Sequence, residues 1–264
     1  MYSSISKIFQ GLIGRGAKGV AYNHASIPAG AVIIAIGDIH GNLNALDKLL
    51  AKLRSDVIPD AKEILCIFLG DYIDRGQASK RVVERLIDWS DKHTTIFLQG
   101  NHEASLLQFL EDPVRGGNWL KHGGIETLID YGVIPTLGPY SPRETIALRD
   151  QLLLKLPKTH QTFFQNLNLF HSVGDYMFVH AGINPKVPIF DNNPLDLLWI
   201  REPFLKHRSL FEKVVIHGHT ITPNGEPEIR RNRVGIDTGS YFNGIITAMI
   251  IQGDQKSFLS SKSI

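Results

Sequence analysis

The segment Val32-Ile-Ile-Ala-Ile-Gly-Asp-Ile-His-Gly41 passes from a run of apolar residues directly into polar ones. Its first half is short, apolar and β-branched, which is the pattern of a buried strand. Residues 64–69 and 95–98 repeat this pattern, and each repeat runs into a glycine followed by polar side chains, at Gly70 and Gly100. We therefore expect three buried strands in the first third of the chain.

Helical patterns follow each of these strands. The first helix is expected from apolar residues at helical spacing, namely Leu43, Leu46, Leu49, Leu50 and Leu53. A second helix, with Ser79 as its N-cap, carries Val82, Val83, Leu86 and Ile87, and a third begins near Glu103. This alternation of strand and helix predicts parallel strands joined by right-handed crossovers.

The remainder of the chain divides into a helical middle and a strand-rich end. In the middle, Ser141-Pro-Arg-Glu144 has capping-box spacing, so a helix should run to about Leu156, with another over residues 158–167. The predicted later strands are residues 176–180, 213–217, 233–237 and 245–251. We expect an α/β sandwich: a single domain over residues 31–264, a helical cap at about 104–172, and a loosely ordered tail over residues 1–30.

Composition narrows the class of protein. The chain has 264 residues, of which 43% are hydrophobic and 20% charged, and its formal charge of +2 is too small to argue for a nucleic-acid partner. Its one cysteine, Cys66, excludes an intramolecular disulfide and a cysteine-based zinc site. No apolar stretch is long enough to cross a bilayer. These features predict a cytoplasmic enzyme, and they leave its oligomeric state open.

Polar side chains gather where the predicted strands end. Five such segments together contain five of the eleven histidines: Gly37-Asp-Ile-His-Gly-Asn42, Gly70-Asp-Tyr-Ile-Asp-Arg-Gly76, Gly100-Asn-His-Glu103, Val179-His-Ala-Gly182 and His217-Gly-His-Thr220. Ligands of open α/β sheets bind beyond the carboxyl ends of the strands. The five segments are therefore expected to meet in one site.

The residue types in these segments favour a metal centre. Asp, His and Asn without cysteine suit manganese, iron or zinc better than calcium, which prefers oxygen ligands alone. A carboxylate from the middle strand could bridge two ions about 3.5–4 Å apart. Such a pair lowers the pKa of a shared water and clamps the oxygens of an in-line displacement at phosphorus.

On these motifs the chain resembles the calcineurin-like metallophosphoesterases, and within them the phosphoprotein phosphatases, especially the short bacterial and phage-type members. The first three segments match that family's signature motifs without gaps. Further similarity lies in Asp175-Tyr-Met-Phe-Val-His-Ala-Gly182, Leu198-Trp-Ile-Arg-Glu202 and Ile236-Asp-Thr-Gly239. The resemblance covers about residues 32–251 and is loosest over 104–172. It implies two mixed sheets flanked by helices.

The resemblance also implies roles for individual residues. Asp38 and His40 would bind a first divalent metal, and Asp71 would bridge it to a second. The second metal would also be held by Asn101, His180 and His219. Manganese is the expected metal, with iron or zinc as alternatives, and the hydroxide shared by the two ions would attack phosphorus directly.

The remaining implied roles concern the leaving group and the phosphate. His102 would protonate the leaving oxygen, with Asp74 orienting its ring. Arg75 and Arg201 would hold the phosphoryl oxygens. Glu103 is expected to support His102 or its loop, and His217 to support or pack around the ligands, with a direct role as the alternative. Trp119 is expected to pack, with a place beside the substrate cleft as the alternative, and His122 is expected to be a solvated histidine at a helix end. Ile221 stands where the wider superfamily often has a second histidine.

Three functions remain open from the sequence. The favoured one is a serine/threonine protein phosphatase acting on a phosphoprotein or small phosphoester, with phosphotyrosine also open. The alternative is a diadenosine tetraphosphate hydrolase; such relatives usually depart from histidine at the position of His40, which this chain keeps. An inactive phosphopeptide-binding scaffold is the third, although every ligand position is occupied.

Overall fold

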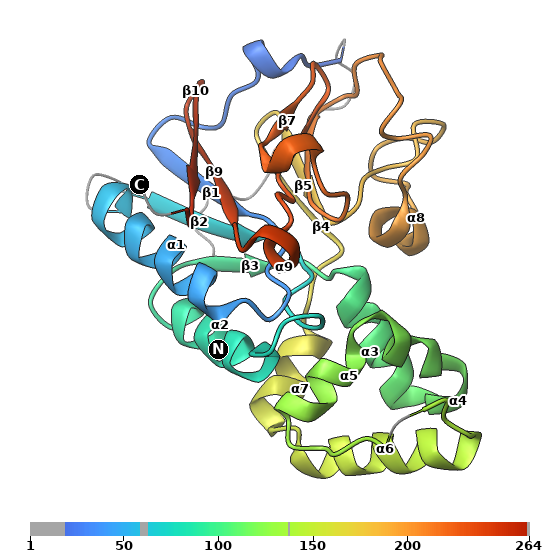
Figure 1. Cartoon of the computed structure of the whole chain (residues 1–264). Helices are drawn as coiled ribbons and strands as arrows, with labels where there is room; N and C mark the ends of the chain where they lie inside the picture. Colours follow the sequence, from blue (N-terminus) through green and yellow to red (C-terminus); the bar gives the residue numbers. More distant parts are fainter. Residues whose placement is uncertain (1–18, 59–62, 137, 263–264) are drawn as a thin grey trace.

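Two five-stranded sheets form the centre of the computed structural model, which describes residues 19–58, 63–136 and 138–262 (Figure 1). The first sheet has the order β10-β9-β1-β2-β3, with β1 Ala31–Ile36, β2 Glu63–Phe68, β3 Thr95–Phe97, β9 Thr247–Gln252 and β10 Gln255–Ser260. The second has the order β4-β5-β6-β8-β7, with β4 Phe170–Val173, β5 Tyr176–Val179, β6 Val214–His217, β7 Glu228–Ile229 and β8 Arg233–Gly235.

Both sheets are mixed, as expected. In the first, β1, β2 and β3 are parallel, whereas β9 and β10 run antiparallel to their neighbours. In the second, β5, β6 and β8 are parallel, and β4 and β7 pair antiparallel at the edges. The carboxyl ends of six parallel strands therefore lie at one end of the sandwich, where the loops that follow them can converge.

The period of two along β1 explains the two main cores. Alternate residues of a strand point to opposite faces of its sheet. Ile33 belongs to the cluster that packs the two sheets together, with Phe178 and Ile216 of the second sheet. Ile34 belongs to the cluster on the other face, where Leu46 and other helical side chains cover the sheet. All of these side chains are buried, so β1 is apolar on both faces.

Helices cover the first sheet and form a separate cap. The helices α1 Leu43–Asp56 and α2 Ser79–Ser90 pack on the outer face of the first sheet. The cap (Figure 1, green to yellow) contains α3 Asn101–Glu111, α4 Pro113–Gly116, η4 Gly117–His122, α5 Gly124–Asp130, α6 Pro142–Lys155 and α7 Lys158–Gln165. The remaining short helices are η2 Tyr22–His24, α8 Pro194–Trp199, η5 Pro223–Gly225 and α9 Ser240–Asn243.

The expected helix start at Ser141 is confirmed. The Ser141 side chain accepts from the backbone N–H of Glu144, and the Glu144 carboxylate accepts from the N–H of Ser141, so the capping box is complete. At α2 the prediction was wrong, because Ala78 is the N-cap and Ser79 is the first helical residue. The Ser79 hydroxyl instead accepts from the backbone N–H of Asp74 at 3.0 Å.

Three strands were not predicted, and part of the expected tail is packed. The strands β4, β7 and β10 are short or lie at sheet edges, where apolar periodicity is weak. The predicted tail covered residues 1–30; residues 1–18 lie outside the described residues. In residues 19–30, Ala25 and Ile27 are buried against the core between the sheets. The backbone N–H of Val20 also donates to the carbonyl of Phe211.

Two smaller expectations concern Cys66 and the membrane. Cys66 is a free, buried thiol on β2, as expected. None of the described helices combines the length and apolarity needed to cross a bilayer. The cytoplasmic location stays a prediction.

Candidate metal centre

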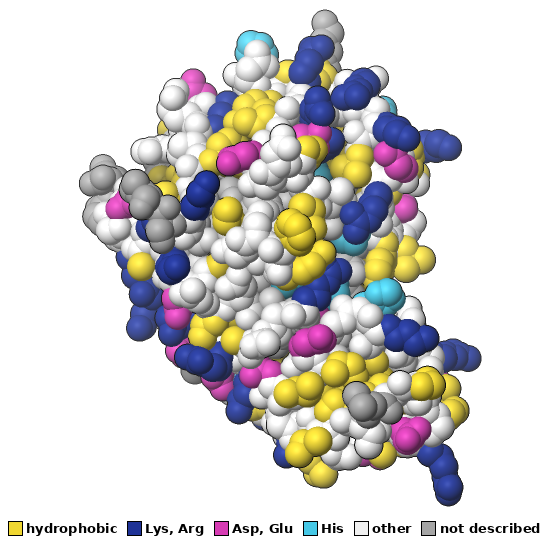
Figure 2. All heavy atoms as spheres, in the orientation of Figure 1, with side chains coloured by type: hydrophobic (Ala, Val, Ile, Leu, Met, Phe, Trp, Pro, Cys, Tyr) yellow, Lys and Arg dark blue, Asp and Glu magenta, His cyan; other side chains and the backbone are white. Residues whose placement is uncertain are grey.

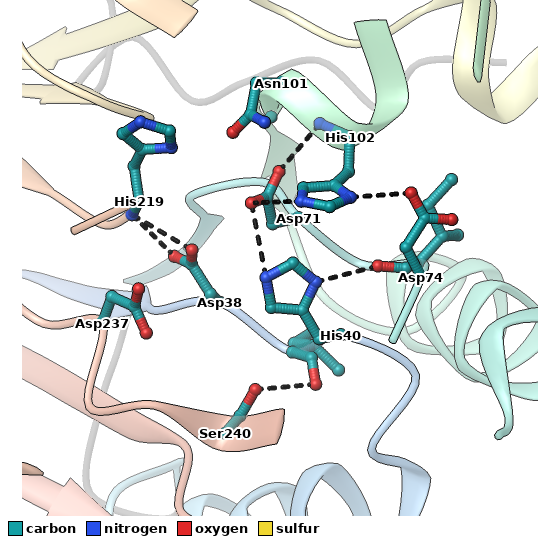
Figure 3. Close-up of polar contacts among 12 residues, drawn as sticks. Asp38, His40, Asp71, Asp74, Asn101, His102, His219, Asp237 and Ser240 are labelled. Atoms are coloured by element: carbon teal, nitrogen blue, oxygen red, sulfur yellow. Dashed lines mark hydrogen bonds and ion pairs between the residues drawn. The ribbon is translucent and has the colours of Figure 1, made fainter. Parts of the chain in front are cut away.

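The five polar segments meet in one cluster, as the sequence predicted. Figure 3 labels residues of four of them, and His180 of the fifth offers a ligand atom within 4.8 Å of those of Asp71 and His219. Asp38 and His40 follow β1, Asp71 and Asp74 follow β2, and the Asn101–His102 pair begins α3 beyond β3. His180 and His219 come from the loops after β5 and β6 of the second sheet. The structure thus brings both sheets to a single cluster of buried polar side chains.

Asp71 is shared by two groups of possible metal ligands. His40, Asp71 and His102 form one group, and Asp71, His180 and His219 form the other, with the ligand atoms of each group within 4.8 Å of one another. The Asp71 Oδ2 lies 3.5 Å from His40 Nε2, and its Oδ1 lies 3.4 Å from His180 Nε2. Each carboxylate oxygen therefore faces a different histidine, which is the arrangement a bridging ligand requires.

Asp38 adds a second carboxylate beside Asp71. Both of its oxygens accept from the backbone N–H of His219, at 3.2 and 3.0 Å. Gly218 allows this approach, because a Cβ there would lie 2.0 Å from Asp38 Oδ1. Burial, followed by the charges of Asp237 and Asp71, raises the pKa of Asp38 well above its usual range. A cation at this point would relieve that repulsion.

The histidines present neutral nitrogens to the same space. Burial lowers the pKa of His40 to about 3 and that of His219 to about 2, so both rings are neutral near pH 7. A metal requires the neutral imidazole. His219 Nε2 is buried without a hydrogen-bond partner among the described residues. This unpartnered nitrogen, aimed at Asp71, fits a metal ligand better than a packing residue.

His180 and Asn101 give a second indication of a cation site. The Nδ1–H of His180 donates to the carbonyl of Leu69 at 2.9 Å, which leaves the lone pair on Nε2. That nitrogen lies 2.9 Å from Asn101 Oδ1, which is also an acceptor. Two lone pairs this close repel each other, and a cation bound by both atoms removes the repulsion. The residues present therefore fit the divalent metals expected from the sequence.

His102 and Asp74 form a hydrogen-bonded pair at the edge of this cluster. His102 Nδ1 lies 2.7 Å from Asp74 Oδ2, and its Nε2 lies 3.9 Å from Asp71 Oδ2. Burial alone would lower the pKa of His102, but the charges of Asp71 and Asp74 outweigh it and raise the pKa above its usual value. The ring is therefore suited to carry a proton toward the cluster.

The cap supplies two further donors to Asp74. Trp119 Nε1 donates to Asp74 Oδ2 at 2.7 Å, and Thr127 Oγ1 donates to Asp74 Oδ1 at 2.6 Å. The sequence analysis assigned Trp119 to packing, and its ring does stack near Phe109. Its hydrogen bond to Asp74 was not predicted, because no local pattern pairs residues this far apart. From the sequence, Thr127 resembles part of the bacterial-branch cap, but no role at the site was predicted for it.

The two arginines lie at the rim of the site. Arg75 is exposed, and its guanidinium lies 4.3 Å from the centre of the Tyr241 ring. Arg201 is also exposed and donates to the hydroxyl of Thr220 at 2.8 Å. Both are free to contact an anion above the cluster, where the sequence analysis placed the phosphate.

Glu103 holds the loops rather than facing the cluster. Its carboxylate accepts from the backbone N–H groups of Gly100, Asp71, Tyr72 and Ile73. The expected supporting role of this residue agrees with that geometry. It ties the start of α3 to the loop after β2, so that Asp71 and His102 keep their relative positions.

Other residues with open roles lie around the cluster. His217 is buried, with its Nε2 3.2 Å from the guanidinium of Arg233, so both ring nitrogens are engaged away from Asp71. His122 is exposed and lies 3.1 Å from the Asn118 amide. Asp237, which the sequence analysis did not single out as a site residue, faces Asp38 in Figure 3, and burial raises its pKa to about 6.

Replacing Asp71 by Asn tests the shared carboxylate. The amide keeps the shape of the side chain but carries no charge to share between two cations. We expect the wild type to retain about two divalent ions per chain after dialysis and Asp71→Asn to retain less than one, as measured by elemental analysis. Asp88→Asn, at an exposed position of α2, should retain the wild-type content. Equal metal contents in all three proteins would rule out the bridging role.

Comparisons with known proteins agree with this geometry. The profile of the family described as calcineurin-like phosphoesterase matches residues 31–239. A bis(5'-nucleosyl)-tetraphosphatase PrpE [asymmetrical] of Anoxybacillus flavithermus is 26% identical over 242 residues, covering 81% of this chain and 88% of the relative. The protein of the same name from Geobacillus sp. is 28% identical over 236 residues, covering 81% and 87%.

Solved structures show the same fold at low identity. One assigned to a diadenosine tetraphosphatase superposes with a TM-score of 0.62 at 16% identity, covering 91% of this chain and 100% of that one. A cold-active protein tyrosine phosphatase superposes with a TM-score of 0.57 at 14% identity, covering 97% and 84%. The family profile spans residues 31–239, which is most of the chain. The chain therefore belongs to the calcineurin-like phosphoesterases.

Proposed function

We propose that this chain hydrolyses dinucleoside polyphosphates, with phosphoproteins as the second candidate substrate. The relatives named bis(5'-nucleosyl)-tetraphosphatase, which match along most of their length, support the first. The match of the motif residues to the phosphoprotein phosphatases, and His40 in particular, supports the second. The sequence-based preference for a protein phosphatase therefore stays a prediction.

The observation that supports phosphoester hydrolysis is the position of the His102–Asp74 pair beside the shared Asp71 carboxylate. Two divalent cations held by the six proposed ligands would activate a water and neutralise charge on the phosphate oxygens. Arg75 and Arg201 would hold those oxygens from the rim. The His102 Nε2–H would then donate its proton to the oxygen that leaves phosphorus.

Asp74 acts on His102 and not on the substrate. Its carboxylate accepts from His102 Nδ1, which fixes the ring orientation and leaves Nε2 directed toward the cluster. Burial raises the pKa of Asp74 above its usual value, and the hydrogen bonds from His102, Thr127 and Trp119 oppose that rise and favour the ionised carboxylate. A buried, ionised Asp74 stabilises the imidazolium that His102 must be before it gives up its proton.

Parallel assays distinguish the two substrates. Metal-stripped protein is reloaded with manganese and incubated with diadenosine tetraphosphate and with a phosphothreonine peptide, and products are separated by chromatography. Asymmetric cleavage of diadenosine tetraphosphate yields adenosine monophosphate and adenosine triphosphate, and we expect these to form faster than phosphate from the peptide. A faster reaction with the peptide would replace the first candidate by the second. No product from either would contradict both.

The role of His102 predicts a dependence on the leaving group. An alkoxide is a poor leaving group that needs a proton, whereas an aryl oxide or a phosphate oxygen is stable as an anion. We expect His102→Ala to slow release of phosphate from the phosphothreonine peptide by about 10²- to 10⁴-fold. The loss with p-nitrophenyl phosphate should be much smaller, and the metal content should not change.

His122→Ala is the matched control, because His122 is an exposed histidine of the cap. It should behave as the wild type toward both substrates. An equal loss for both leaving groups in His102→Ala would show that His102 acts on binding or structure and not on the departing oxygen.

A further inference from the structure

A pocket of about 580 Å³ opens beside the metal centre and has no part in the mechanism above. We call it the α9 pocket. It lies between the start of α1, the loop that leads into α2, and the helix α9, and His40 forms its inner end. Its volume lies within the range of pockets that bind small molecules. A group bound here would lie directly next to the proposed first metal.

The walls of the α9 pocket carry unused polar groups. Asn44, Gln77 and Arg81 line it, are exposed, and make no side-chain hydrogen bond to any described residue. Amide side chains offer both donors and acceptors, which match the mixed edges of a heterocycle or a sugar. By contrast, the one carboxylate in the lining, Asp47, is engaged by Arg85 at 2.6 Å.

Tyr241 supplies an aromatic surface at the mouth of the α9 pocket. Its ring is 44% exposed, stands edge-on to His40 at 5.3 Å, and has the Arg75 guanidinium stacked over it. Tyr241 lines the pocket, whereas Arg75 does not. Figure 2 shows hydrophobic side chains exposed over α9 with basic side chains directly below them.

We propose that the α9 pocket binds one nucleoside of the substrate, with its base stacked on Tyr241. This inference rests on the proposed dinucleotide substrate. A base stacked there would leave its phosphate chain to pass Arg75 and His40 into the metal centre. Every base offers a flat face for stacking, so the pocket would tolerate different bases. The phosphothreonine side chain itself carries no flat group that could stack on this ring.

Calorimetry on the manganese-loaded protein tests the pocket without relying on turnover. The affinity of adenosine monophosphate is compared with that of inorganic phosphate, and the ratio of the two dissociation constants isolates what the nucleoside adds. Stacking of one base predicts that adenosine monophosphate binds about 5- to 150-fold more tightly than phosphate. In Tyr241→Ala the ratio should fall close to one, even if the loss of the Tyr241–Arg75 contact also weakens phosphate binding.

Two control variants test whether the effect of Tyr241→Ala comes from the loss of its ring in the pocket and not from misfolding or from the loss of any exposed aromatic side chain. Tyr241→Phe keeps the ring and should keep the ratio. Phe242→Ala removes a neighbouring aromatic that is 83% exposed but does not line the pocket, and it should also keep the ratio. Trp199→Ala tests the other exposed aromatic near the centre, whose ring lies 6.3 Å from His219.

The outcomes separate this inference from the proposed function. The inference would be overturned by any of three results, even if diadenosine tetraphosphate is hydrolysed. These are equal affinities of the wild type for adenosine monophosphate and phosphate, no binding of adenosine monophosphate, and an unchanged ratio in Tyr241→Ala. A collapse of the ratio in Trp199→Ala alone would place the nucleoside on the opposite side of the centre and would also overturn it. A ratio that depends on Tyr241, with no cleavage of the dinucleotide, would keep the nucleoside site and reject only the substrate.

Discussion

The structure depends on keeping the Asp71 carboxylate ionised while it is almost completely buried. Removing a charge from water costs several kcal/mol unless other groups compensate. Burial alone would raise the pKa of Asp71. In the acid range where this carboxylate titrates, the surrounding histidines are protonated, and their charges, that of His180 first, hold the pKa of Asp71 well below its usual range. The backbone N–H of His102 adds a hydrogen bond at 3.1 Å. Each of these partners comes from a different loop, so the position of one carboxylate fixes how the strand-end loops converge.

That convergence requires unusual backbone geometry. Six described non-glycine residues have positive φ, and all but Asn224 belong to the site: His40, Asp71, Asp74, Arg75 and His219. Such conformations cost of order 1–3 kcal/mol each and persist only where the surrounding structure enforces them. Here the apolar packing between the sheets and the four N–H groups held by Glu103 provide that enforcement. The strain is therefore a consequence of directing side chains from several loops at one point.

The sequence predicted what is local and missed what is long-range. The strand-end segments were recognisable because each joins an apolar strand to its polar residues within a few positions, as in Gly37 to Asn42. The contacts of Trp119 and Thr127 with Asp74 join residues 45 and 53 positions apart, and no periodic signal reports them. Asp237 was missed for the same reason, because only the pairing of β6 with β8 brings it to Asp38. Ser79 was misassigned for a different reason. Its hydroxyl is suited to capping a helix, but it accepts a hydrogen bond from the backbone N–H of Asp74 in the preceding loop instead.

The two halves of the site are built by different parts of the chain. The cap holds Asp74 through two side chains and also accepts the backbone N–H of Arg75 through the carbonyl of Gly123. It therefore holds the carboxylate that contacts His102 and the backbone of Arg75, the two residues proposed to act on the leaving oxygen and on the phosphate. The α9 pocket, in contrast, is lined by residues of α1, of α9 and of the loop that leads into α2. No cap residue lines the α9 pocket, but the Gly123 carbonyl of the cap holds the backbone of Arg75, whose guanidinium stacks on Tyr241, so the two halves of the site are joined through Arg75.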